Sequence, residues 1–134
     1  MVRILVVDDN PTVRHYLRSI LEQHSSWRVW EARTGEEALG QVRSSPPDLV
    51  VLDFRMPDLN GLEVAREIGR EHPGTPILMV TVHLSTELAA QAKAAGIRGA
   101  CAKSDIGSLV QAAEAVLRQE TYFPASLSQD GVAM

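Results

Sequence analysis

Five polar side chains stand directly after short apolar runs of the sequence. They are Asp8 and Asp9 after the first run, Asp53 after the second, Thr81 after the third and Lys103 after a weaker fourth. Carboxylates placed close together raise each other's pKa unless a cation intervenes, and one lysine cannot neutralise three of them. Oxygen ligands at a shallow, hydrated site favour Mg²⁺. If these side chains meet, the sequence predicts a magnesium site.

Asp53 could do covalent chemistry in such surroundings. A carboxylate can act as a nucleophile and form an aspartyl phosphate. The metal would neutralise charge on the transferred group, Lys103 could add a point charge, and the Thr81 hydroxyl could donate to a phosphoryl oxygen. Each residue alone is weak evidence, so the hypothesis depends on all of them converging.

The elements that would bring these side chains together are buried parallel strands. Continuous apolar, β-branched runs are typical of strands covered on both faces. Trp27–Glu31 interleaves charges and suits an edge strand, whereas residues 99–102 form a short and weak one. The continuous runs are Ile4–Val7, Leu49–Leu52 and Ile77–Val80.

Helix signals separate these strands. Asn10-Pro11, Thr34 with Glu37, Asn60-Gly61 and Ser85 each precede a helical pattern, and the last helix is expected to begin at Ser104 or Asp105. Five strands that alternate with five helices predict a doubly wound (βα)5 parallel sheet. Ligands of such sheets bind beyond the carboxyl ends of the strands, which is where the five polar residues stand.

Composition limits the classes of function. The 134 residues are 45% hydrophobic and 22% charged, which fits one globular domain. A formal net charge of −4 gives no basic surface for nucleic acid, and no apolar run reaches the roughly 18 residues of a membrane span. Met1-Val2-Arg3 leads straight into an apolar strand without a secretory signal, so we expect a cytoplasmic domain with no direct nucleic-acid or membrane contact.

Residues 2 to about 119 resemble the receiver domain of two-component response regulators. The motifs that carry the resemblance are Val6-Val7-Asp8-Asp9-Asn10, Leu52-Asp53-Phe54-Arg55-Met56-Pro57, Asn60-Gly61, Thr81 and Lys103. The resemblance implies a flavodoxin-like five-stranded sheet in the order 2-1-3-4-5. It divides the chain into a receiver domain over residues 1–120 and a linker-like tail over residues 121–134.

The resemblance also implies a role for each site residue. Asp53 would accept phosphate from a phosphohistidine of a sensor histidine kinase or a histidine phosphotransfer protein. Asp9, Asp53 and the main-chain carbonyl of Arg55 would ligate Mg²⁺, with Asp8 acting largely through water. Thr81 would move toward the phosphoryl group and Lys103 would pair with it. The resulting conformational shift would change partner binding, with a homodimer as one outcome.

Three positions depart from the family pattern. Ala100 stands where the family usually has Tyr or Phe, Ser104 follows the lysine in place of proline, and Val82 is bulkier than the usual Ala or Gly. These changes affect the signalling route and the kinetics more than the phosphorylation chemistry.

The tail Gln119–Leu127 resembles the segment that joins receivers to a DNA-binding domain in NarL/FixJ (LuxR-type) regulators. The resemblance implies the regulatory part of a transcriptional regulator.

Other classes of function remain as alternatives. An aspartate-nucleophile phosphatase usually carries Asp-x-Asp after its first strand, whereas Asp8-Asp9 is followed by Asn10-Pro11. A nucleotide or flavin binder would be marked by Gly-x-Gly-x-x-Gly, which does not occur. A degenerate interaction module that works without phosphorylation is the main alternative to a phosphoacceptor.

Overall fold

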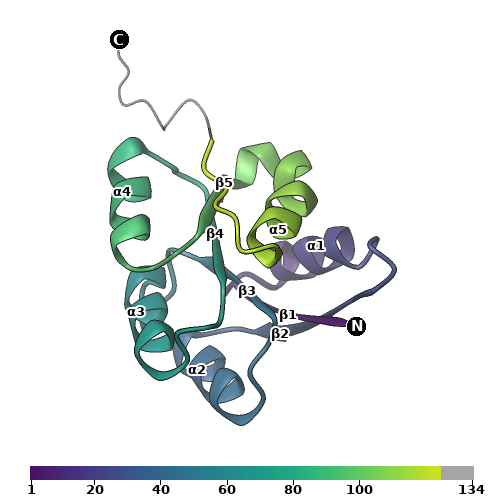
Figure 1. Cartoon of the computed structure of the whole chain (residues 1–134), viewed down its shortest axis with the longest axis horizontal. Coiled ribbons are helices and arrows are strands. Elements are labelled where there is room, and N and C mark those ends of the chain that lie inside the picture. The colour runs from purple at the N-terminus through teal and green to yellow at the C-terminus, as the bar shows by residue number, and fades with distance from the viewer. Residues whose placement is uncertain (125–134) are drawn as a thin grey trace.

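The computed structural model describes residues 1–124 and shows one parallel sheet between two layers of helices (Figure 1). The strand order is β2-β1-β3-β4-β5, and each neighbouring pair is parallel. Both the doubly wound (βα)5 architecture and the order 2-1-3-4-5 are thereby confirmed. The elements are β1 (Val2–Val7), α1 (Pro11–Leu21), β2 (Trp27–Ala32), α2 (Gly35–Ser44), β3 (Leu49–Asp53), α3 (Gly61–Glu71), β4 (Ile77–Thr81), α4 (Thr86–Ala94), β5 (Gly99–Ala102), the 3₁₀ helix η1 (Lys103–Ser108) and α5 (Leu109–Leu117).

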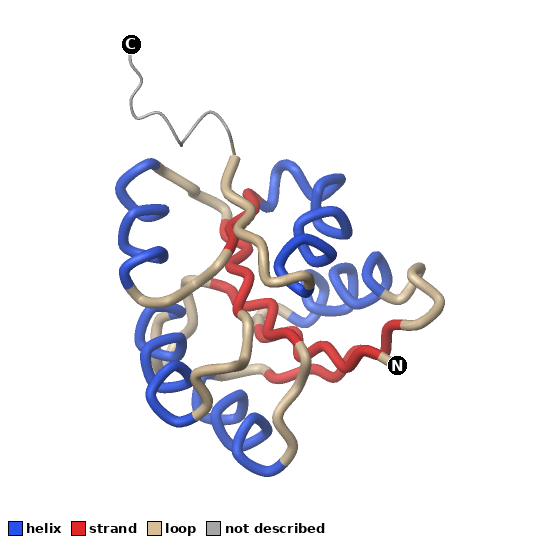
Figure 2. The backbone as a smooth tube through the Cα atoms, viewed as in Figure 1, coloured by secondary structure: helices blue, strands red, loops and turns tan. Residues whose placement is uncertain are grey.

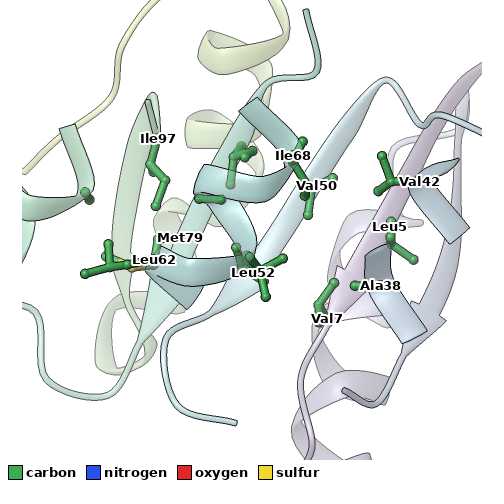
Figure 3. Packing of buried hydrophobic residues seen from close by; sticks show 14 of the residues in the cluster. Leu5, Val7, Ala38, Val42, Val50, Leu52, Leu62, Ile68, Met79 and Ile97 are labelled. Atoms are coloured by element: carbon green, nitrogen blue, oxygen red, sulfur yellow. The ribbon is translucent and has the colours of Figure 1, made fainter. Parts of the chain in front are cut away.

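The sheet separates two hydrophobic cores. Figure 2 shows the strands in red with blue helices on both sides of the sheet. Successive side chains of a strand point to opposite faces. Leu5 and Val7 therefore pack with α2 and α3 (Figure 3), while Ile4 and Val6 pack with α1 and α5. Burial on both faces explains why β1, β3 and β4 are continuously apolar.

The predicted helix starts are present with their caps. The Asn10 side chain accepts hydrogen bonds from the backbone N–H of Thr12 and Val13, and Ser85 accepts from Leu88. Asn60 forms a complete capping box with Glu63. These caps start α1, α3 and α4 after the loops that follow β1, β3 and β4, and so define where the loops of the site end.

The expected start of the last helix is wrong. The chain forms η1 first, with Asp105 outside helical geometry, and α5 begins only at Leu109. Ser104, Asp105 and Gly107 are weak helix formers, and the Ser108 hydroxyl donates to the Asp105 carbonyl at 2.9 Å. This local hydrogen bond competes with a regular first helical turn.

The outer edge of β5 is covered by the chain that follows α5, which we call the C-terminal strap (Thr121–Phe123; Figure 1). The Tyr122 N–H donates to the Arg98 carbonyl at 2.9 Å, and the Ala100 N–H donates to the Tyr122 carbonyl at 2.8 Å. Residues 125–134 of the predicted tail lie outside the described residues. Among the described helices none is long and apolar enough to cross a membrane.

Candidate phosphoacceptor site

The structure brings the five predicted polar residues to one edge of the sheet. Asp8 and Asp9 directly follow β1, Asp53 and Thr81 end β3 and β4, and Lys103 directly follows β5. A cavity of about 200 Å³ opens there. Its lining residues are Asp53, Arg55, Thr81, Val82, His83 and Lys103.

Three carboxylates form a compact cluster beside this cavity. Asp8, Asp9 and Asp53 each offer one oxygen atom, and these atoms lie within 4.8 Å of one another. Asp8 and Asp53 are buried, whereas Asp9 is exposed. Hard oxygen ligands with one side open to water suit a divalent cation such as Mg²⁺, which retains several of its waters. The residues present therefore fit such an ion.

Lys103 connects two of these carboxylates to β5. Its Nζ atom lies 2.8 Å from Asp8 Oδ2 and 3.4 Å from Asp53 Oδ1. Burial works to lower the pKa of Lys103, but the hydrogen bond to Asp8 and the charge of Asp53 outweigh it and raise that pKa. Lys103 is thus held as a cation at the site.

The pKa of Asp53 reflects its burial first and the negative charge of Asp8 second. Burial and the Asp8 charge raise the pKa of Asp53 from 3.8 to about 6, although Lys103 opposes them. A second cation would relieve this repulsion and favour the ionised, nucleophilic form of Asp53.

Thr81 and Val82 form the side of the cavity that belongs to β4 and the following loop. Thr81 is buried at the strand end, and its register partner on β5 is Ala102. Val82 is 59% exposed at the rim, together with the exposed Arg55 and His83. A reactant bound over Asp53 would therefore lie next to Thr81 and pass Val82.

One buried residue near the site was missed by sequence reasoning. The Nη1 atom of Arg14, on α1, donates to the Asp8 main-chain carbonyl at 2.8 Å, and its Nε atom donates to Glu31 Oε1 at 2.7 Å. A signal existed in the sequence, because Arg14 shares the buried helical stripe of Leu17 and Leu21.

Comparisons with known proteins agree with this geometry. The model of the family described as "Response regulator receiver domain" matches residues 4–114. Response regulator UvrY of Escherichia coli (strain K12) is 34% identical over 131 residues, which cover 96% of this chain and 60% of the relative. The chain thus spans about 60% of the length of this curated relative.

Solved structures give the same assignment. A LuxR-family two-component response regulator from Aurantimonas sp. SI85-9A1 is 35% identical with a TM-score of 0.92, over 97% of this chain and 94% of that one. A CheY-like receiver domain protein from Methanospirillum hungatei JF-1 is 27% identical with a TM-score of 0.81, over 89% and 95% of the two chains. The similarity to this LuxR-family relative confirms the resemblance to that subgroup. On the family match, the relatives and the shared fold, the chain belongs to the response regulator receiver domain family.

Proposed function

We propose that Asp53 is the phosphoacceptor of this receiver domain. The observation that carries the proposal is the cluster itself. A carboxylate oxygen of Asp53 lies within 4.8 Å of carboxylate oxygens of Asp8 and Asp9, and Asp53 Oδ1 lies 3.4 Å from the Lys103 ammonium nitrogen. The donor is a phosphohistidine of a sensor histidine kinase or a histidine phosphotransfer protein. The P–N bond breaks with its electron pair leaving on the histidine, and a P–O bond forms to an Asp53 carboxylate oxygen.

Each neighbouring residue has a part in this transfer. Asp9, Asp53 and the Arg55 main-chain carbonyl would hold Mg²⁺, with Asp8 acting largely through water, and the ion would offset charge on the phosphoryl oxygens. Lys103 pairs with the phosphoryl group, and the Thr81 hydroxyl donates a hydrogen bond to one of its oxygens. Turnover is limited to phosphorylation and dephosphorylation of Asp53 itself.

Phosphorylation shifts a pre-existing equilibrium between two conformations of the domain and so changes the surface offered to a partner, including a second copy of the chain. We take residues 1–120 as this cytoplasmic receiver domain and residues 121–134 as a linker-like tail, of the kind that joins receivers to DNA-binding domains in LuxR-type regulators, whose first residues, the C-terminal strap, dock on β5. The similarity to UvrY and to LuxR-family regulators supports this placement. The receiver domain itself contacts neither nucleic acid nor membrane.

The proposal is tested by incubating the chain with acetyl phosphate and Mg²⁺ and measuring the intact mass. The wild-type protein should gain one phosphoryl group, Asp53→Asn should gain none, and Asp105→Asn, which changes an exposed carboxylate outside the cluster, should behave as wild type. An adduct that persists in Asp53→Asn would reassign the site. A wild-type protein that gains no adduct would favour the phosphorylation-independent interaction module.

A further inference from the structure

Arg14 is a buried charged side chain with no direct contact to the reacting carboxylate oxygens. Its side chain is 8% exposed, and its guanidinium hydrogen-bonds to two different elements: the Asp8 main-chain carbonyl at 2.8 Å and Glu31 Oε1 of β2 at 2.7 Å. A buried guanidinium is costly unless such partners satisfy it. The two contacts therefore set where Arg14 can lie.

Glu31 is a firmly held anchor for this guanidinium. Its Oε2 atom also accepts from Arg18 Nη1 at 3.0 Å, and its main-chain carbonyl accepts from Gln41 Nε2 at 2.9 Å. Burial works to raise the pKa of Glu31, but the hydrogen bonds from Arg14 and Arg18 outweigh it and lower that pKa. Arg14 therefore connects an ionised, anchored carboxylate on β2 to the loop that follows β1.

The atom that Arg14 holds determines how Asp9 is presented. The Asp8 carbonyl and the Asp9 N–H belong to one planar peptide unit. A hydrogen bond that holds this carbonyl therefore also orients the Asp9 N–H and the Asp9 Cα atom that carries the side chain. The Asp8 side chain is held separately, by the Asn10 N–H at 2.9 Å and by Lys103 at 2.8 Å. Asp9 is the exposed member of the cluster, and the contact of Arg14 fixes the carbonyl of the peptide that leads into it.

We propose that Arg14 is a positioning residue that orients the Asp8–Asp9 peptide so that the Asp9 carboxylate is ready to ligate Mg²⁺. This inference rests on the proposed function, in which the cluster binds that ion. Residues that orient metal ligands typically change metal affinity by roughly 10–100-fold when they are replaced. We expect an effect of this size from Arg14.

The sign of the effect separates positioning from simple charge. Removing a nearby positive charge strengthens cation binding by Coulomb's law, so a purely electrostatic role predicts tighter Mg²⁺ binding after the replacement of Arg14. A positioning role predicts weaker binding. The two explanations thus give opposite results for the same variant.

The experiment is an Mg²⁺ titration of the full chain, followed by the amide NMR shifts of the Asp8–Asn10 loop. Arg14→Gln should raise the Kd for Mg²⁺ by roughly tenfold or more. Arg14→Lys keeps one donor and should recover part of the loss. Arg18→Gln is the matched control: it removes a contact to the same Glu31 but none to Asp8, so it should change the Kd far less than Arg14→Gln does.

A second measurement distinguishes weakened Mg²⁺ binding from a loss of folding in the variant. Saturating Mg²⁺ should restore most of the phosphorylation rate of Arg14→Gln, which a general loosening of the domain would not allow. If Arg14→Gln does not fold, Arg14→Lys replaces it: the lysine keeps the positive charge, so a raised Kd in that variant reports lost positioning and not lost charge, and an unchanged Kd would count against the inference.

An unchanged or lowered Kd in Arg14→Gln, or an equal rise in Arg18→Gln, would overturn the inference alone. A wild-type chain that does not bind Mg²⁺ would overturn the proposed function and the inference together.

Discussion

At the scale of single residues, we expect Val82 to restrict the approach to Asp53. Its side chain is 59% exposed at the rim of the cavity, in a position next to Thr81. A branched side chain here narrows the path both for a phosphodonor and for the water that removes the phosphoryl group. Val82→Ala should therefore speed phosphorylation and dephosphorylation together, by a few-fold each. Rates measured with acetyl phosphate provide the test, and unchanged rates would contradict the role of Val82.

The titration of Asp53 should be visible in the metal-free protein. Because its pKa is raised from 3.8 to about 6 in the folded chain, the folded state binds a proton more tightly than the unfolded state does. The contribution of Asp53 to stability is therefore greatest at low pH and is lost as the pH rises from about 4 to about 6.

The carboxyl ¹³C shift of Asp53, measured in the presence of a chelator, should titrate near pH 6, and added Mg²⁺ should lower this midpoint because the cation favours the ionised form. The stability difference between wild type and Asp53→Asn should follow the same pH window. A midpoint near 3.8 would show that the carboxyl is not desolvated as described.

Site residues that stand at the ends of strands could be predicted from the sequence, because the topology of the sheet alone brings them together. Asp53, Thr81 and Lys103 each end or follow a strand, and parallel strands bring their carboxyl ends to one edge. The contacts of Arg14 depend instead on which side chains of α1 and β2 meet after packing. A helical stripe shows that Arg14 is buried, but it does not show which carbonyl accepts its hydrogen bond.

At the scale of elements, Gly61 lets α3 start against the end of β3. A Cβ atom at Gly61 would lie 2.6 Å from the Asp53 carbonyl oxygen and 3.0 Å from the Phe54 Cα atom, both in the backbone. Gly61→Ala should cost about 1–3 kcal/mol through overpacking and should slow phosphorylation by displacing the Asp53 loop.

Gly69 in the same helix is the matched control, because a Cβ atom there meets nothing within 4 Å. Gly69→Ala should stabilise the domain by about 0.5–1 kcal/mol, since alanine is the better helix former. Chemical denaturation of both variants tests the contrast. Effects of the same sign would contradict the close backbone approach at Gly61.

The C-terminal strap should behave as part of the folded domain. Phe123 packs against the core that holds Ala100, and the Lys93 ammonium of α4 lies 4.7 Å from the centre of its ring. Phe123→Ala should cost about 1–2 kcal/mol, less than the roughly 3 kcal/mol of a fully buried ring. Lys93→Gln, which removes only the cation, should cost about 0.5–1 kcal/mol.

Hydrogen exchange of the Ala100 amide measures the same docking, because that amide donates to the Tyr122 carbonyl. It should exchange faster in Phe123→Ala and remain protected in Lys93→Gln. Equal protection in wild type and Phe123→Ala would show that the ring does not hold the strap on β5.

The strands and the starts of the first four helices were predicted correctly because their signals are local: apolar runs, caps and the Pro11 that opens α1. The strap and η1 lack such signals. Tyr122 pairs with Arg98 and Ala100, residues more than twenty positions earlier, and that pairing depends on how α5 packs and returns the chain to β5. The late start of α5 results from a side-chain hydrogen bond at Ser108 that competes with the helical pattern.

At the scale of the whole molecule, the site joins both layers of the fold. The β1, β3 and β4 strands that position it contribute side chains to the two cores on either face of the sheet. The cluster also links distant parts of the chain, since Lys103 bonds to Asp8, 95 positions earlier. Ligand binding at this edge should therefore raise the free energy of unfolding of the entire domain.

This connection gives a test that needs no phosphodonor. A ligand that binds only the folded state stabilises it by RT ln(1 + [L]/Kd), about 2.7 kcal/mol at a hundred times Kd. The Tm of the wild-type chain should rise steadily with the logarithm of Mg²⁺ concentration, because ion binding relieves the repulsion among Asp8, Asp9 and Asp53. Asp9→Asn should lose most of this rise, whereas Asp105→Asn should keep it. An equal rise in all three proteins would mean that Mg²⁺ acts by general screening of a chain with a net charge of −4 and not at the carboxylate cluster.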